Sequence, residues 1–459
     1  MKIKLNLQPQ NIFLILGLVY GIAFLLFLPP LQVPDEYAHF YKAYSISDGQ
    51  LMPEKIGNKA GVYVPVDLRN TSEIIQEKMK LLVKEKQKLD MPFIFKESPI
   101  DNNNKVFVDF SKIAVVTYSP LPYLMPALST AIGKLFNLPP LILIYTAGFV
   151  NLVLWLFLIY LSIKITPVFK WGFLVIALLP MTLFESASVS ADSLTIGLSF
   201  ITIALFLRLS LDDRIKKIYL KDVIVLFLVI LALSLTKMPY FLLSFLFLMI
   251  PADKFGNNKK KIIIFALILS TIFIVALIWL FITKGLYVTE KGVSIHDQLL
   301  FILPHPLLFL QLIWNDLVTN PLKYFKIMVG TNWVSYPLPK SVYYAVISLL
   351  LFLPFLDKND IKIDFKKKSI IIGTFLLITG FIYLFDYLTW TPVGLNKIIG
   401  VQGRYFIPVL PLLFLLFYNN KFKSKDNILK PITVVSIILI LTVTVLFFIG
   451  EYYIDLNFI

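Results

Sequence analysis

Long apolar runs, separated by short connections that hold most of the charge, recur along almost the whole sequence. Such runs suit helices of roughly 20 residues, the length that crosses the hydrocarbon core of a bilayer. The chain is 58% apolar and 15% charged, whereas soluble domains carry about 25% charged residues. In lipid, a helix satisfies its own backbone hydrogen bonds. The sequence therefore predicts an all-α integral membrane protein, a polytopic bundle in which residues 1–459 form one membrane domain.

The positions of the apolar runs predict the number of crossings. The runs fall at 11–31, 119–136, 141–163, 171–184, 193–209, 222–236, 239–251, 262–283, 341–356, 369–388, 403–418 and 431–450. Pro120, Pro122 and Pro126 interrupt the second run, so we expect it to be re-entrant or to lie on the membrane surface. About eleven transmembrane helices remain. The first run reads as an uncleaved signal anchor.

The charge of the connections predicts the orientation. Lys and Arg are concentrated in the connections 164–170, 208–221, 254–261, 357–368 and 421–430. Positively charged connections stay in the cytoplasm. We therefore expect a multi-pass protein of the cytoplasmic (cell) membrane, with a cytoplasmic N-terminus and an extracytoplasmic active site.

Two long connections face outward in this topology. Residues 32–118 form a large first extracytoplasmic loop of mixed charge, in which we expect short surface helices, one beginning at Pro34 and one over Thr71–Leu89. Residues 284–340 form a second extracytoplasmic loop, with an apolar helix near Leu307–Val318. All the candidate site residues fall on this outer side.

Several classes of function are excluded by composition and motifs. The net charge of +15 is spread over short connections that orient the chain, so no nucleic-acid partner is expected. The chain has no Cys, which excludes disulfides and thiolate chemistry. The three histidines, His39, His296 and His305, are too far apart for a metal motif. There is neither a phosphate-binding Gly-rich loop nor a G-x-S-x-G motif.

The first candidate site follows the first apolar run. Pro34 suits the first turn of a helix, and Asp35, Glu36 and His39 come directly after it. A carboxylate at the outer edge of the membrane beside a His is suited to act as a general base on a lipid-linked substrate. The alternative is that the helix dipole alone favours acidic residues there.

Two further candidates are polar positions between apolar runs. Asp192 ends a turn of small polar residues that begins at Pro180, and ionisable residues at membrane depth are usually functional or paired. The alternative is that Asp192 caps the following helix, with help from Ser190. Lys237 lies in a tight turn and could contact substrate or merely end its helix.

The last candidate opens an apolar run near the C-terminus. Gln402, Arg404 and Tyr405 stand at the outer end of this run. An Arg there can bind a phosphate with two parallel hydrogen bonds. The alternative is an interfacial Arg that extends to water. Asp386 is a further intramembrane carboxylate to which the sequence gives no role.

These motifs resemble the GT-C superfamily of membrane glycosyltransferases, which includes protein mannosyltransferases and lipid A aminoarabinose transferases. The matching pieces are Asp35-Glu36 after the first helix, Tyr118-Ser119-Pro120-Leu121-Pro122-Tyr123, and the turn from Leu179-Pro180 to Ser190-Ala191-Asp192. The resemblance implies Asp35 as the base or metal ligand, with Glu36 as the alternative. It also matches Asp192 to the acidic residue of the family's later turn.

The sequence is also similar to a bacterial family of predicted membrane proteins known as domain of unknown function 2142. That similarity rests on Val33-Pro34-Asp35-Glu36-x-x-His39 and on Gln402-Gly403-Arg404-Tyr405-x-x-Pro408. It extends over most of the chain and implies no established activity.

The GT-C resemblance implies a glycosyltransferase. The donor would be a polyprenyl-phosphate sugar, and the acceptor an envelope glycan, lipid or protein, with the bilayer as a partner. Asp192, Lys237, Gln402, Arg404 and Tyr405 would bind substrate. The sequence establishes no cofactor, and a divalent cation (Mg²⁺ or Mn²⁺) held by Asp35, Glu36 and Asp192 stays open. The alternative is a transporter or flippase for an envelope lipid or lipid-linked sugar.

Overall fold

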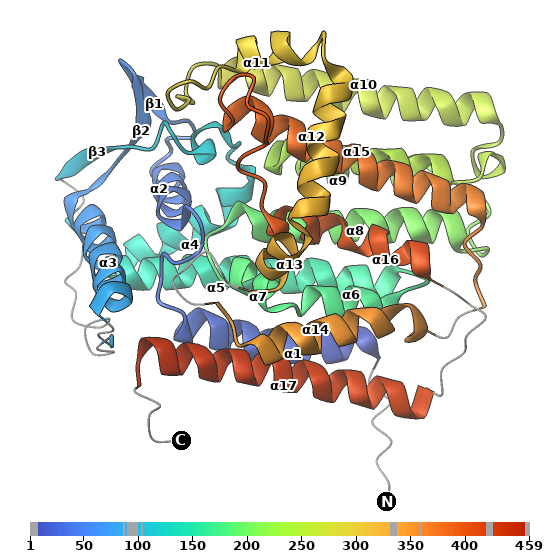
Figure 1. The fold of residues 1–459 in the computed structure, drawn as a ribbon, viewed down its shortest axis with the longest axis horizontal. Coiled ribbons are helices and arrows are strands. Elements are labelled where there is room, and N and C mark those ends of the chain that lie inside the picture. The colour runs from blue at the N-terminus through green and yellow to red at the C-terminus, as the bar shows by residue number, and fades with distance from the viewer. Residues whose placement is uncertain are drawn as a thin grey trace, which may run out of the picture.

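The computed structural model describes residues 8–85, 88–89, 100–101, 104–330, 337–357, 360–418 and 426–454. Its long helices lie side by side in Figure 1. Six helices in the described ranges are long and apolar enough to cross a membrane: α1 (Pro9–Phe27), α5 (Pro140–Ile165), α8 (Ala191–Leu211), α10 (Asn258–Ile282), α15 (Phe365–Thr389) and α17 (Asp426–Tyr452). The structure therefore supports a helical, multi-pass membrane protein.

The predicted count of about eleven transmembrane helices is not confirmed. Several apolar runs form helices that are short or broken: α4 (Leu124–Leu135), α6 (Lys170–Ala177), α7 (Pro180–Ser186), α9 (Leu220–Thr236), α14 (Lys340–Phe352), α16 (Leu410–Phe417) and the 3-10 helices η4 (Met238–Met249), η6 (Leu353–Phe355) and η7 (Gly403–Val409). Helix α4 has 12 residues and is about 18 Å long, well below the roughly 30 Å of hydrocarbon. This length agrees with the prediction that 119–136 does not cross in full.

Prolines explain where the broken helices end. Pro180 follows the break between α6 and α7, Pro239 follows the break between α9 and η4, and Pro408 and Pro411 lie where η7 passes into α16. A proline has no N–H to donate and clashes with the preceding turn. The α9–η4 break places Lys237, and η7 places Arg404, inside the bundle.

Burial separates the central helix from the helices at the periphery. In the 18-residue apolar stretch of α8, 89% of the residues are buried inside the protein, whereas the corresponding share in α10 is 17%. Helix α8 packs against α5, α9, η4 and η7. A helix that is apolar on all sides and exposed in the isolated chain is suited to contact lipid. We infer that α10 faces the bilayer and that α8 forms the core.

The first loop contains helices and also a small sheet. The helices are α2 (Glu36–Ser47), α3 (Val66–Glu85) and the 3-10 helices η2 (Ala114–Thr117) and η3 (Leu121–Tyr123). Helix α3 confirms the helix expected near Thr71–Leu89. The prediction of an all-α fold missed strands β1 (Glu54–Ile56), β2 (Lys59–Pro65) and β3 (Lys105–Asp109), which pair antiparallel in that order. The pairing of β1 with β2 is a local hairpin through Gly57 and Asn58, whereas β3, the other partner of β2, lies beyond α3, so local patterning could not reveal the third strand.

A buried lysine joins the beginning of this loop to its end. The Nζ of Lys42 donates hydrogen bonds to the carbonyl oxygens of Val115 (2.9 Å), Val116 (3.5 Å) and Tyr118. Burial lowers the pKa of Lys42 to about 7, and the three carbonyls act in the opposite direction because they favour the charged ammonium. Lys42 thereby joins α2 to the segment that precedes η3.

The second loop lies across the long helices. It comprises α11 (Ile295–Ile302), α12 (Pro306–Thr319) and α13 (Pro321–Val329), and α11 and α12 meet at 103°. Helix α12 confirms the apolar helix expected near Leu307–Val318, and it crosses the direction of the long helices in Figure 1. The Asp316 carboxylate accepts hydrogen bonds from the Tyr383 hydroxyl, at 2.7 Å, and from the Tyr324 hydroxyl. These contacts join α12, α13 and α15.

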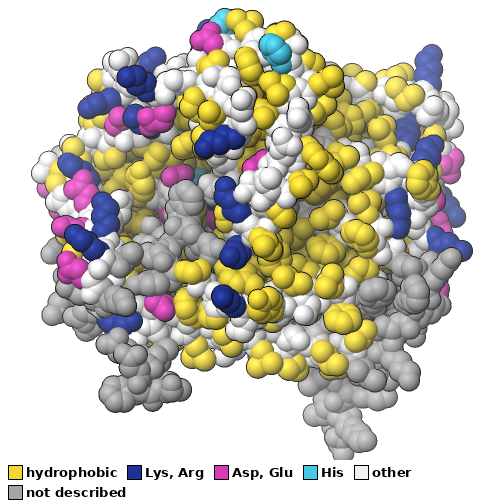
Figure 2. Space-filling model, viewed as in Figure 1, with side chains coloured by type: hydrophobic (Ala, Val, Ile, Leu, Met, Phe, Trp, Pro, Cys, Tyr) yellow, Lys and Arg dark blue, Asp and Glu magenta, His cyan; other side chains and the backbone are white. Residues whose placement is uncertain are grey.

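The two ends of the bundle differ in charge. In Figure 1 the elements of the first loop lie at the left-hand end, and the connections after α8, η4 and α14 lie at the right-hand end. A short 3-10 helix, η5 (Ala252–Phe255), belongs to one of these connections. Figure 2 shows hydrophobic side chains over much of the middle of this face, many Lys and Arg at the right-hand edge, and Lys and Arg mixed with Asp and Glu at the left-hand edge. The Lys- and Arg-rich connections after α8, η4 and α14 therefore lie together at one end, as the predicted orientation requires.

Because the chain has no Cys, single cysteines can test the orientation. Asn58→Cys lies in the exposed turn between β1 and β2, and Lys216→Cys in the exposed connection between α8 and α9. We expect an impermeant maleimide to label position 58 in intact cells, and position 216 only after permeabilisation. The reverse pattern would invert the predicted topology.

Candidate functional site

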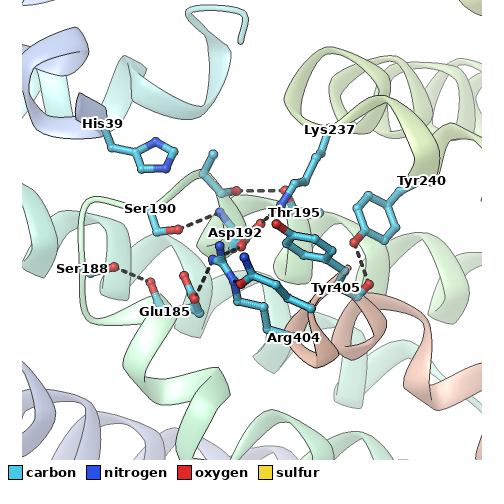
Figure 3. A network of polar contacts seen from close by, with 12 residues as sticks. His39, Glu185, Ser188, Ser190, Asp192, Thr195, Lys237, Tyr240, Arg404 and Tyr405 are labelled. Atoms are coloured by element: carbon cyan, nitrogen blue, oxygen red, sulfur yellow. Dashed lines mark hydrogen bonds and ion pairs between the residues drawn. The ribbon is translucent and has the colours of Figure 1, made fainter. Parts of the chain in front are cut away.

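Four buried charged side chains from four segments meet in the interior of the bundle (Figure 3). Nη1 of Arg404, in η7, lies 2.8 Å from Oε1 of Glu185 in α7 and 2.7 Å from Oδ2 of Asp192 in α8. Nζ of Lys237, between α9 and η4, lies 2.5 Å from Oδ1 of Asp192. We call these four residues the charge cluster. It joins parts of the chain that are far apart in sequence.

The charge cluster is both buried and balanced. Side-chain exposure is 0% for Glu185, 9% for Arg404, 12% for Asp192 and 17% for Lys237. Two cations face two anions, so the desolvated charges neutralise one another. Removing a charge from water is expensive unless a partner and further hydrogen bonds compensate it. Clusters of this kind within membrane proteins usually mark a functional position.

The turn between α7 and α8 positions the acidic half of the cluster. Asn151 Nδ2, in α5, donates to the carbonyl oxygens of Ser188 (2.9 Å) and Ser190 (3.1 Å). The N–H of Asp192 donates to Ser190 Oγ, so Ser190 is the cap of α8. The alternative that Asp192 itself is the helix cap is therefore wrong. Its carboxylate is turned to Lys237 and Arg404.

The basic half is positioned by η7 and its neighbours. A Cβ on Gly403 would lie 1.9 Å from the Tyr324 carbonyl oxygen, so only glycine permits this approach of η7 to α13. Gln402 Oε1 accepts a hydrogen bond from Arg404 Nε at 2.8 Å. The Tyr405 ring lies under both cations, 4.6 Å from Lys237 Nζ and 5.2 Å from Arg404 Cζ. The Arg404 side chain is thus held in one orientation.

Asp35 supplies a half-buried carboxylate without a partner. It precedes the first turn of α2 with φ 59° and ψ 15°, in the left-handed region that Asp tolerates better than most residues. Its carboxylate caps no N–H of α2 and forms no hydrogen bond or ion pair with the described chain. Burial raises the pKa of Asp35 above its ordinary value, and the charges of Arg404 and Lys237 oppose that shift. Asp35 therefore lies within electrostatic reach of the charge cluster.

Glu36, in contrast, accepts hydrogen bonds from backbone N–H groups with both of its carboxylate oxygens. Its Oε1 accepts from the N–H of Val189 at 3.1 Å, and its Oε2 from the N–H of Val33 at 3.3 Å. Burial raises the pKa of Glu36 to about 7. The side chain ties the start of α2 to the turn between α7 and α8. This arrangement gives Glu36 a positioning role and leaves Asp35 as the accessible carboxylate of the pair.

His39 is buried and neutral. Its Nδ1 lies 2.7 Å from the Tyr123 hydroxyl, and burial lowers the pKa of His39 to about 3. Figure 3 places its ring beside the turn that carries Ser190 and Asp192. A neutral imidazole cannot neutralise a carboxylate, so His39 is suited to hydrogen bonding at the edge of the site.

The family of the chain can be stated once this geometry is known. The family described as Predicted membrane protein (DUF2142) matches residues 18–413. The chain belongs to this family. The matched range contains every candidate residue from Asp35 to Tyr405. No curated protein and no solved structure matches the chain in the other two comparisons.

The carboxylates of this DUF2142 protein do not assemble into a metal site within the described ranges, where no three His, Asp or Glu residues could together hold an ion. Both oxygens of Asp192 accept from cations, and both oxygens of Glu36 accept from backbone N–H groups. Of the three carboxylates considered as ligands in the sequence, Asp192 and Glu36 are therefore engaged by different partners, and Asp35 is left by itself.

Two partners in the site were not identified from sequence. Glu185 interrupts an apolar run, which is a detectable signal, but its partner Arg404 lies more than 200 residues later in the chain. Tyr123 belongs to the Tyr118–Tyr123 motif, and its contact with His39 depends on the packing of α2 against η3. Only the three-dimensional arrangement reveals either contact.

The charge cluster makes a prediction about stability. Arg404→Met leaves Glu185 and Asp192 with one cation between them, and breaking a buried pair costs about 3–5 kcal/mol in the free energy of unfolding. We expect the double variant Glu185→Gln/Arg404→Met to lose less stability than Arg404→Met alone, because the double variant no longer contains the uncompensated charge of Glu185. Equilibrium unfolding in detergent measures the free energy of unfolding of both variants. An Arg404→Met protein as stable as the wild type would contradict the inferred pairing.

Proposed function

We propose that this DUF2142 protein is a GT-C-type glycosyltransferase that takes a sugar from a polyprenyl-phosphate donor and transfers it to a cell-envelope glycan, lipid or protein on the outer face of the cytoplasmic membrane. The observation that supports this proposal most is the unpaired carboxylate of Asp35 within electrostatic reach of the buried cations Arg404 and Lys237. One group can accept a proton while the other two stabilise a phosphate.

The cations retain capacity for a ligand. Arg404 uses Nη1 and Nε in its contacts with Glu185, Asp192 and Gln402. Its Nη2 takes part in none of the hydrogen bonds of the described chain, and Lys237 donates from Nζ to a single oxygen. A phosphate oxygen could therefore accept from Nη2 and Nζ without breaking the charge cluster.

The reaction follows from these positions. Asp35 takes the proton from the acceptor hydroxyl as its oxygen bonds to the anomeric carbon of the donor sugar. The bond from that carbon to the phosphate oxygen breaks, and the polyprenyl phosphate leaves with the electron pair. Arg404 and Lys237 stabilise the charge that develops on the phosphate. Attack from the opposite face inverts the configuration of the sugar.

The alternative is a transporter or flippase for an envelope lipid or lipid-linked sugar, and one observation favours it. Lys237 and Arg404 both lie where helices are interrupted, at the α9–η4 break and in η7 before α16. Interrupted helices with exposed backbone form the binding sites of many transporters. Counterflow of a lipid-linked sugar in proteoliposomes, without any transfer, would support this function over the enzyme.

Replacing the proposed base tests the enzyme. Asp35→Asn preserves size and tolerance of the left-handed conformation, and it removes the charge that accepts the proton. We expect transfer from radiolabelled polyprenyl-phosphate sugars to an envelope acceptor to fall about 10²–10⁴-fold. The exposed control Asp101→Asn should transfer normally. Equal rates in wild type and Asp35→Asn would rule out Asp35 as the base.

The pH dependence provides a separate test of the same residue. Asp35 accepts a proton only when ionised, so kcat/KM should fall as the pH drops through its pKa. Because burial raises that pKa above 3.8, we expect the acid limb of the profile at a higher pH than an ordinary Asp gives. The limb should be absent from the residual activity of Asp35→Asn. A limb retained in that variant would assign it to another group.

A further inference from the structure

A second carboxylate without a partner lies beside the charge cluster. Asp386 is in the last turn of α15 and is 8% exposed. Its backbone carbonyl accepts from the N–H of Trp390 and the hydroxyl of Thr391. Its carboxylate forms no hydrogen bond or ion pair with the described chain.

The end of helix α15 and the burial of position 386 both disfavour a carboxylate there. The C-terminal end of a helix carries partial negative charge, which repels an anion. Burying a carboxylate without a partner adds a desolvation cost. Such a group persists where a ligand uses it. The fold of α15 therefore does not account for an acidic residue at position 386.

The loop that follows α15 connects Asp386 to the site. Gly400 has φ +104°, and a Cβ there would lie 2.9 Å from Oδ1 of Asp386 and 3.1 Å from Cγ of Trp390. Two residues later, Gln402 begins the segment that carries Arg404. Lys237 and Arg404 are also the charges that act on Asp386. Asp386 and Asp35 are thus two unpaired carboxylates near the same pair of cations.

We propose that Asp386 binds the sugar of the donor, accepting hydrogen bonds from its hydroxyl groups while Arg404 and Lys237 hold the phosphate. This inference rests on the proposed function. The two oxygens of a carboxylate can accept from two adjacent hydroxyls. A cationic ligand is disfavoured because Lys237 and Arg404 already place positive charge beside the carboxylate. Trp390, which is 42% exposed, offers an aromatic face next to it.

Binding of two carriers to the full-length protein in detergent tests this assignment. The probes are radiolabelled polyprenyl phosphate and the same carrier bearing a hexose. For Asp386→Ala we expect the Kd of the hexose carrier to rise about tenfold or more, because hydrogen bonds to a charged group are lost. The Kd of the bare carrier should stay the same. Asp386→Asn should be intermediate, since its amide oxygen still accepts.

Controls separate the possible failures. Asp297→Asn removes an exposed carboxylate in α11 and should bind both carriers as wild type does. If Asp386→Ala does not fold, Asp386→Asn provides the measurement. Equal affinity of the Asp386 variants and wild type for the hexose carrier would overturn this inference, and transfer by wild type would leave the proposed function standing. A wild-type protein that binds neither carrier would overturn both.

Discussion

The ion pairs of Arg404 are the constraint on which the interior of this protein depends. One guanidinium contacts Glu185 of α7 and Asp192 of α8, and Asp192 also contacts Lys237 at the α9–η4 break. In an apolar interior, a charge that loses its partner is costly, so these segments can pack only in an arrangement that keeps the pairs together. Hydrophobic contacts would permit many relative positions of apolar helices. The ion pairs select one of them.

The broken helices make this cluster possible. An uninterrupted apolar helix presents only side chains to its neighbours, because its backbone groups bond to one another. At the breaks before Pro180 and Pro239, and along η7, the chain changes direction inside the bundle. The α9–η4 break places Lys237, and η7 places Arg404, at the centre instead of at a membrane surface. The site is therefore a consequence of segments that fall short of ideal transmembrane helices.

Sequence reasoning could predict the class of protein and the residues of the site, but not how those residues pair. Hydropathy predicts a helical membrane bundle, and the motifs indicate Asp35, Asp192, Lys237 and Arg404 as site residues. The number of crossings stayed uncertain because hydropathy does not register where a proline shortens a helix. The sheet was missed because its strands β1 and β2 form only a short hairpin, and the strand that completes the sheet, β3, lies beyond α3. The different roles of Asp35 and Glu36 depend on φ at Asp35, which no pattern of residue types reveals.

The left-handed backbone at Asp35 restricts which residues that position accepts. Glycine, asparagine and aspartate adopt this conformation readily, whereas other residues pay a steric cost. Of these three, only aspartate has a carboxylate. The substitutions at position 35 that best preserve the fold, Asp to Asn and Asp to Gly, are therefore ones that remove the charge. Among DUF2142 proteins, a chain with Asn or Gly at this place would be a folded relative that lacks the proposed base.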